Sequence, residues 1–82
     1  MKIENVNVLE VSDYKRTIQF RKNDIVEILY NISGKNKKCI GRITFIDFNH
    51  VEIDASKHYK CDIRNIRYND IDSIKLINRE NN

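Results

Sequence analysis

The stretch from Lys38 to Phe48, KCIGRITFIDF, decides how this chain must fold. It is too apolar for a strand with a single buried face, because Ile43 and Phe45 lie on one side of an extended chain and three more apolar side chains lie on the other. A long strand that bends can bury each side in turn, and Gly41 is the residue that would allow the bend. Bent strands of this kind close very small barrels, so the stretch predicts one.

The segments around this stretch predict further strands. Ile25 to Ile32 alternates, with Val26, Ile28, Tyr30 and Ile32 on one face, and His50 to Ala55 alternates with Val51, Ile53 and Ala55 inward. Asn5 to Ser12 and Thr17 to Phe20 predict an N-terminal hairpin. Turns are expected at 12–15, 22–24, 47–49 and 56–58, and a loop at 33–37.

The C-terminal third allows two interpretations. Isoleucines and Asp70 recur at three- and four-residue steps from Ile63 to Ile77, which is the spacing of a helical stripe. The β-branched isoleucines and the Asp72-Ser73 pair favour strands instead. We therefore expect a strand over 59–68, one helical turn over 69–72 and a closing strand over 73–77, with a continuous helix as the alternative. The prediction is an all-β fold, a small antiparallel barrel of five to six strands.

Length and composition limit what the chain can be. With 82 residues it is expected to form a single domain over 1–77, followed by a polar flexible tail over 78–82. Its 15 positive and 12 negative side chains leave a net charge of +3. This charge is compatible with nucleic-acid binding but is not by itself evidence for it. Met1 to Glu10 lacks the apolar core of a signal peptide, and no stretch reaches the ~18 apolar residues of a membrane span. We expect a cytoplasmic protein without membrane contact.

Three segments carry a family resemblance. Gly41 to Asp47 places a glycine six residues before an aspartate across an apolar strand, and it resembles the first signature of the Sm-like family, which includes the bacterial Hfq-type riboregulators. Asn49 to Ile53 is similar to the third strand of that family. Tyr68 to Ile74 resembles its second signature, a polar loop that leads into a closing strand. The resemblance covers roughly residues 25–77 and implies a barrel that binds single-stranded RNA.

The chain also departs from that family. Sm-like proteins usually begin with a helix, whereas 5–20 predicts strands here, and Asn69 stands near the histidine of the Hfq-type loop. No glycine follows Gly41, so the arginine-glycine pair of the eukaryotic loop is missing. Lys22 to Val26, followed by the glycine strand, resembles the KOW and Src-homology barrels almost as well. An SH3-like barrel is therefore the rival prediction.

The Sm-like resemblance implies a set of RNA contacts at the turns over 47–50 and 67–70. Bases would stack on flat side chains and phosphates would meet cations. The candidate stacking residues are Phe48, His50 and Tyr68, and Asn49 and Asn69 could read base edges. The candidate phosphate contacts are Lys35, Lys37, Lys38, Arg42, Arg64 and Arg67. Each has an ordinary alternative: the aromatic residues belong to a core or its rim, Asn49 suits a turn, and the lysines form a solvated loop tip.

Other chemistry has less support in the sequence. His58 and Cys61 have the spacing of metal ligands, and Cys39 and His50 could complete a zinc site, but the paired spacing occurs once rather than twice. We expect no metal, no cofactor and no catalysis, since neither a phosphate-binding glycine loop nor a nucleophile motif is present. An open barrel leaves an unpaired strand edge that a second copy could cover. The alternative function is a protein-interaction or structural adaptor, such as an accessory factor of a mobile element or phage, that grips a protein partner through that edge.

Overall fold

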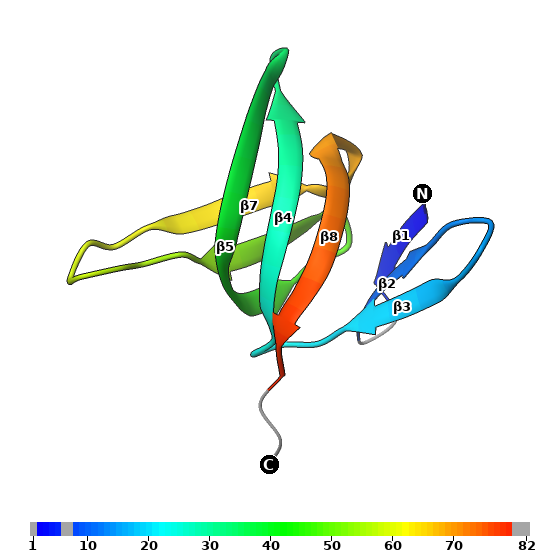
Figure 1. Cartoon of the computed structure of the whole chain (residues 1–82), viewed down its shortest axis with the longest axis horizontal. Helices are drawn as coiled ribbons and strands as arrows, with labels where there is room; N and C mark the ends of the chain where they lie inside the picture. Colours follow the sequence, from blue (N-terminus) through cyan, green and yellow to red (C-terminus); the bar gives the residue numbers. More distant parts are fainter. Residues whose placement is uncertain (1, 6–7, 80–82) are drawn as a thin grey trace.

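A computed structural model describes residues 2–5 and 8–79, which form an all-β domain of two antiparallel sheets (Figure 1). The three-stranded sheet has the order β1-β2-β3, and the five-stranded sheet has the order β7-β6-β5-β4-β8. The strands are β1 (Lys2–Asn5), β2 (Leu9–Ser12), β3 (Thr17–Phe20), β4 (Ile25–Ile32), β5 (Lys35–Ile46), β6 (His50–Asp54), β7 (Ile63–Arg67) and β8 (Ile71–Asn78). The all-β prediction is confirmed.

The β4–β5 hairpin turns over two residues, not over the expected five-residue loop. Ile32 pairs with Lys35, so only Ser33 and Gly34 lie between the strands. Both have left-handed φ values, 53° and 81°, as in the tight turns whose twist matches that of a hairpin. Asn31 Oδ1 accepts a hydrogen bond of 3.1 Å from the Gly34 amide. The lysines at 35, 37 and 38 therefore belong to a strand and not to a loop tip.

β5 bends at Gly41, as the sequence predicted. The strand pairs with β4 up to Arg42 and with β6 from Arg42 onward, so it changes partners beside the glycine. A Cβ atom on Gly41 would lie 2.8 Å from the carbonyl carbon of Asp54 and from a methyl carbon of Ile53. In Figure 1 the β6–β7 pair runs across the direction of β4 and β8. Only glycine permits β6 to approach this closely at the corner.

The core lies between these crossed halves. Val26, Ile28, Val51 and Ile53 are fully buried, as their alternation predicted. Phe45 was expected to share a face with the buried Ile43, but its side chain is 52% exposed. The ladder between β5 and β6 shifts register between residues 43 and 45, and a bulge of this kind reverses the alternation beyond it. Ile32, at the end of β4, is also exposed where the sequence placed it inward.

The C-terminal third forms strands, so the continuous helix is excluded. η1 (Tyr68–Asp70) is a single helical turn that begins one residue earlier than predicted, and β8 follows it directly. β7 begins at Ile63, later than the expected start at Tyr59. β8 pairs with β4 and buries Ile71 on its inner face. Because β7 and β8 pair only with β6 and β4 in the described ladders, the predicted barrel is open along this side.

The N-terminal hairpin is part of a three-stranded sheet. β2 and β3 form the predicted pair, with Leu9 opposite Phe20, and β1 adds a strand that the sequence did not predict. Leu9 and Phe20 are buried in the same core cluster as the five-stranded sheet. Of the expected first strand, Val6 and Asn7 lie outside the described residues. Within the part of the chain described, no helix has the length and hydropathy to cross a membrane.

Asn78 and Arg79, which the sequence assigned to a flexible tail, make defined contacts with the rest of the domain. Asn78 is the last residue of β8, and Arg79 after it donates from Nε to Asp24 Oδ1 over 3.0 Å and from Nη2 to Asp24 Oδ2 over 2.9 Å. Residues 80–82 of that tail lie outside the described residues. Asn78 and Arg79 therefore belong to the folded domain.

Asp24 is the buried acid that receives this arginine. Its residue surface is only 2% exposed, and the Arg21 amide donates to Oδ2 over 2.8 Å. Burial by itself would raise the pKa of Asp24, but the hydrogen bonds from Arg79 and Arg21 outweigh it and lower the pKa. The charged pair thus joins the end of β8 to the link between the two sheets.

Candidate nucleic-acid interface

The sequence-predicted site residues divide between the two ends of the β6–β7 ladder. We call the segments 47–50 and 67–70 the turn end, and the segment 55–62 with its neighbours on β5 and β7 the loop end. His50 pairs with Arg67 at one end of the ladder, and Asp54 pairs with Ile63 at the other. His50 and Asp54 are four residues apart on β6, so the two ends are separated by roughly 13 Å.

At the turn end the structure brings together the two segments that the resemblance implied. The Tyr68 amide donates to the Asn49 carbonyl oxygen over 3.0 Å. The Tyr68 hydroxyl donates to the carbonyl oxygen of Asp47. These bonds fix η1 against the β5–β6 turn, so residues far apart in the sequence form one continuous polar surface.

Most polar side chains of the turn end already have partners. The Asn49 side-chain oxygen lies 2.8 Å from His50 Nδ1, and Arg67 Nε donates to Asp70 Oδ2 over 3.3 Å. Burial, followed by the nearby charge of Asp47, raises the pKa of Tyr68 to about 12. These side chains are thus held by contacts within the domain, and the acids offset much of the local positive charge.

Four residues of the turn end are exposed to solvent: Phe48, Asn49, Arg67 and Asn69. Phe48, at 79%, is an exposed aromatic residue. An exposed phenylalanine could stack on a base, as the resemblance implied. Phosphates, however, need cations nearby, and the two acids of this end weaken that attraction.

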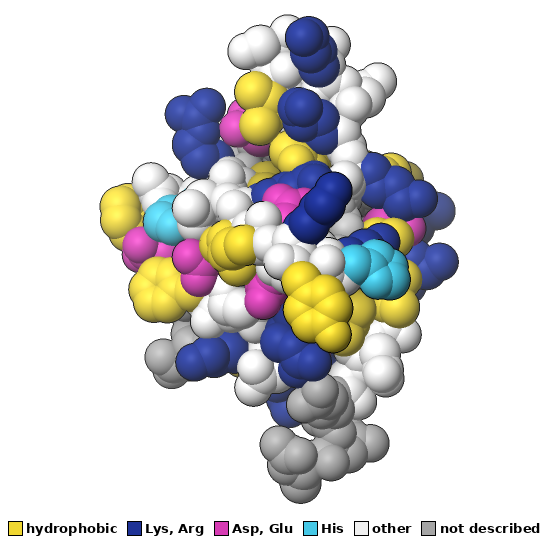
Figure 2. All heavy atoms as spheres, turned by 90° about the vertical axis from the view of Figure 1, so that its left-hand side faces the viewer, with side chains coloured by type: hydrophobic (Ala, Val, Ile, Leu, Met, Phe, Trp, Pro, Cys, Tyr) yellow, Lys and Arg dark blue, Asp and Glu magenta, His cyan; other side chains and the backbone are white. Residues whose placement is uncertain are grey.

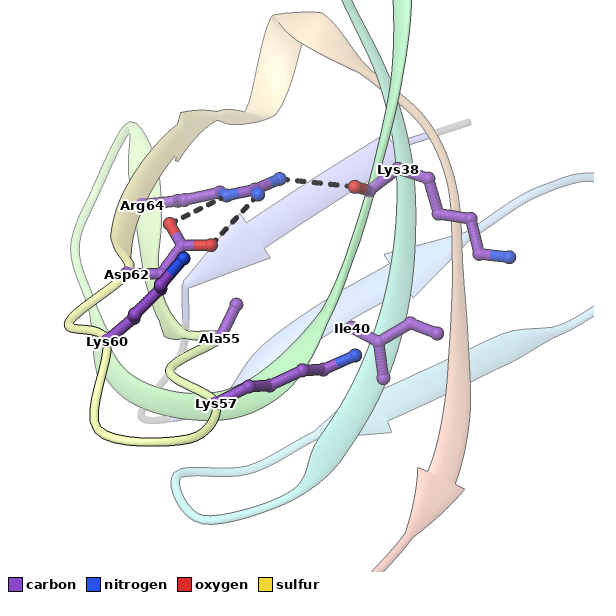
Figure 3. A pocket seen from close by; sticks show the side chains of 7 residues that line it. All are labelled: Lys38, Ile40, Ala55, Lys57, Lys60, Asp62 and Arg64. Atoms are coloured by element: carbon purple, nitrogen blue, oxygen red, sulfur yellow. Dashed lines mark hydrogen bonds and ion pairs between the residues drawn. The ribbon is translucent and has the colours of Figure 1, made fainter.

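The loop end contains a hollow of about 510 Å³ that collects positive charge. We call it the basic hollow; its lining residues are Lys38, Ile40, Ala55, Lys57, Lys60, Asp62 and Arg64 (Figure 3). The cations come from β5, from the β6–β7 loop and from β7, so separate elements converge on one place. Among its described lining residues, four are cationic and Asp62 is the single acid.

Arg64 and Asp62 form the fixed wall of the basic hollow. Arg64 Nε and Nη2 each donate to one Asp62 carboxylate oxygen over 3.0 Å. Arg64 Nη1 donates to the Tyr30 hydroxyl over 3.2 Å and to the Lys38 carbonyl oxygen over 3.1 Å. The Arg64 hydrogen bonds lower the pKa of Asp62, which burial alone would raise. The charges of Arg64 and Asp62 therefore offset each other, and Lys57 and Lys60 supply most of the excess positive charge of the hollow.

The other predicted cations continue this surface. Lys37 lines an adjacent hollow of about 570 Å³, which shares Lys38 and Arg64 with the first. Lys38 Nζ lies 3.7 Å from Glu27 Oε2, and its side chain is 60% exposed. Lys35 lies beyond them in β5, beside the hairpin turn. Figure 2 shows Lys and Arg side chains from the hairpin tip to the middle of this face, with acids between them.

Arg42 lies at the corner of β5, next to the basic hollow but not among its lining residues. It pairs with Asp54 in the ladder and with Ile25 on the other side. It lines a separate small hollow together with Lys57 and Asp54. Its positive charge therefore stands beside an acid rather than in the basic hollow.

Three residues of the loop end were not among the sequence-predicted contacts. Lys57 and Lys60 line the basic hollow. Tyr59, which lies between them in the chain, is fully exposed to solvent. The sequence assigned this segment to a turn and the start of a strand. The run Lys57-His58-Tyr59-Lys60, an aromatic residue between cations, is the signal that could have found them.

The candidate metal ligands are not assembled. Cys39 is buried in the core, and burial raises the pKa of its thiol, whereas Cys61 is exposed. His50 lies at the turn end and His58 in the β6–β7 loop. Within residues 2–5 and 8–79, no three His, Cys, Asp or Glu side chains are close enough to hold a metal ion.

No family model matches this chain, and neither a curated protein nor a solved structure matches it. The Sm-like resemblance therefore stays a prediction. What the chain can bind has to be inferred from the chemistry of its two ends.

Proposed function

We propose that this chain is a non-catalytic β-domain that binds single-stranded nucleic acid, RNA in the first place, with its phosphates in the basic hollow. One observation carries the proposal: cations from three elements converge there, and Asp62, the acid among the described lining residues, is occupied by Arg64. A polyanion entering the hollow meets positive charge without a competing free carboxylate. Displacement of its counterions supplies the affinity.

The lysines are suited to phosphates rather than to a small acidic ligand. Lys57 and Lys60 are exposed, so each keeps much of its hydration and contributes charge more than fixed geometry. Ile40 and Ala55 add apolar surface to the lining of the hollow, which bases or sugars could cover. Arg67 lies three residues further along β7, so its side chain is on the opposite face of the strand from Arg64 and does not extend the hollow.

The adaptor function is the second candidate, and the open sheet favours it. β7 and β8 form the edges of the five-stranded sheet in the described ladders, and an edge strand can pair with another chain. Ile63 on β7 and Ile77 on β8 are 44% and 49% exposed. A protein partner or a second copy of this chain would cover these edges.

The test measures fluorescence anisotropy of labelled oligouridylate, with the matched DNA strand beside it, across a series of salt concentrations. For each lysine that contacts a phosphate, the slope of log K against log salt changes by about 0.7. The double variant Lys57→Gln/Lys60→Gln should therefore flatten the slope by about 1.4 and weaken binding by about tenfold at low salt.

Lys15→Gln/Lys22→Gln is the matched control, because it removes the same charge. Lys15 lies in the β2–β3 turn, on the opposite side of the molecule from the β6–β7 loop (Figure 1). The control should bind within about twofold of wild type. Equal losses in both double variants would contradict the hollow as the site. No binding at low salt, together with a larger mass by light scattering, would favour the adaptor function.

A further inference from the structure

The β6–β7 loop holds two neighbouring residues in a left-handed conformation. His58 has a φ of 51° and Tyr59 a φ of 68°. Lys57 and Lys60 pair across them, and the Lys60 amide donates to the Lys57 carbonyl oxygen over 3.0 Å. These features define a two-residue turn with the φ signs that normally select Asn-Gly or Asp-Gly.

Tyrosine is an unfavourable residue at this position. A left-handed backbone brings Cβ too close to the neighbouring carbonyl oxygen, and glycine avoids this crowding. The two-residue turn between β4 and β5 has Gly34 at the equivalent place. Tyr59 is also fully exposed, so packing within the domain does not offset the backbone strain. Backbone strain that no packing contact offsets is typical of functional sites.

The backbone beneath Tyr59 is firmly held. The Ala55 amide donates to the Asp62 carbonyl oxygen over 2.8 Å, which closes the base of the loop. The Ser56 hydroxyl oxygen accepts a hydrogen bond of 3.0 Å from the Asp62 amide. The Ser56 amide in turn donates a hydrogen bond of 2.9 Å to Asp54 Oδ1. The tyrosine ring is therefore carried on a braced turn and not on a loose loop.

From this geometry we propose that Tyr59 is the residue on which an unpaired base stacks while the flanking lysines meet the adjacent phosphates. The inference rests on the proposed function and deepens it. Lys57 and Lys60 line the basic hollow and closely flank the ring in the chain, so one nucleotide could meet both kinds of contact. Stacking on an aromatic ring tolerates any base but needs a base that is free of a partner strand. The site should therefore prefer single strands to duplexes.

The test compares oligoadenylate with an abasic strand of the same length and the same number of phosphates. Wild type should bind the oligoadenylate about tenfold more tightly than the abasic strand. Tyr59→Leu keeps an apolar side chain but lacks the π surface, so it should bind oligoadenylate about tenfold more weakly and abolish this preference. Tyr59→Phe keeps the ring and should bind like wild type.

A further variant separates stacking from folding. Tyr59→Gly relieves the left-handed strain, so its melting temperature should rise by a few degrees while its affinity for oligoadenylate falls as in Tyr59→Leu. A variant that is more stable yet binds less tightly is the result expected of a stacking residue.

The results of these measurements distinguish base stacking on Tyr59 from the more general proposal that the chain binds nucleic acid. If Tyr59→Leu binds oligoadenylate like wild type while Lys57→Gln/Lys60→Gln binds weakly, stacking is overturned and nucleic-acid binding stands. If Tyr59→Leu weakens both strands equally, the ring does not act through a base, and the inference is again overturned. If neither variant changes the affinity, the inference and the proposed function fail together.

Discussion

The two ends of the β6–β7 ladder use similar residue types for different purposes. At the turn end, Tyr68 is bound to backbone oxygens and Arg67 to an acid, so both hold η1 in place. At the loop end, Tyr59 is fully exposed and the lysines beside it line an open hollow. Tyr68 and Arg67 thus join two segments of the fold, whereas Tyr59 and its flanking lysines make no such contact in the described structure and are the residues we propose for binding.

The largest expected effect is on the corner that forms the loop end. Gly41→Ala places a Cβ atom against the backbone of Asp54, which cannot move without displacing β6. We expect a loss of about 3 kcal/mol in the free energy of unfolding, measured by urea denaturation. Nucleic-acid binding should fall with it, because β6 leads into the β6–β7 loop.

Gly34→Ala is the control for this change. Gly34 is left-handed, and a Cβ atom added there would meet no atom of the described residues within 4 Å, so the substitution adds only backbone strain. Its expected cost is about 1 kcal/mol. If Gly41→Ala costs no more than Gly34→Ala, the close approach of β5 and β6 does not shape the loop end.

A smaller effect is expected at the turn end. Tyr68→Phe removes the hydroxyl that donates to the Asp47 carbonyl oxygen, so it should destabilise the domain by about 1 kcal/mol and leave binding at the basic hollow unchanged. Tyr14→Phe is the control, since Tyr14 is 92% exposed. A loss of affinity in Tyr68→Phe without a loss of stability would show that the turn end binds directly.

The same hydroxyl gives the turn end a pH dependence. The pKa of Tyr68 rises from 10.0 to about 12 on folding, so the protonated form is favoured in the folded state. Its contribution is complete below pH 10 and is lost as the pH rises toward 12. The difference in stability between wild type and Tyr68→Phe should therefore shrink across this window. A constant difference would contradict the burial of this hydroxyl beside Asp47 in the folded state.

The smallest effect is expected from the cation of the turn end. Arg67→Gln removes a charge that Asp70 already offsets, so affinity for oligouridylate should change by less than about twofold. The measurement is the same anisotropy assay that is used for the lysines of the basic hollow. A loss as large as that of Lys57→Gln/Lys60→Gln would place phosphates at both ends and remove the contrast between them.

The sequence predicts the fold better than the site. Clean alternation in β4 and β6 predicts their buried faces, and Gly41 predicts the bend, because burial and backbone freedom are local properties. The outward turn of Phe45 was not predictable, since the bulge depends on the register between two strands. The pairing of Arg79 with Asp24 was missed for a similar reason, because it joins positions 55 residues apart.

The candidate site depends even more on tertiary structure. The sequence indicated Lys37, Lys38 and Arg64 as cations, but their meeting place with Lys57 and Lys60 depends on how β5 bends and crosses β6. The ion pair between Arg64 and Asp62 also determines which cations of the hollow remain available to a ligand. The spacing of the two residues in the sequence does not predict this pair. The exposure of Tyr59 follows from the left-handed φ values of His58 and Tyr59, which histidine and tyrosine do not favour.

The Arg79–Asp24 pair has a consequence for how the domain is completed during synthesis. Asp24 leads into β4, the strand that pairs with both β5 and β8, but its cation lies 55 residues later in the chain. Until that cation has been made, the carboxylate can leave water only at a high energetic cost. The link between the two sheets should therefore become fixed only after β8 and Arg79 have been made.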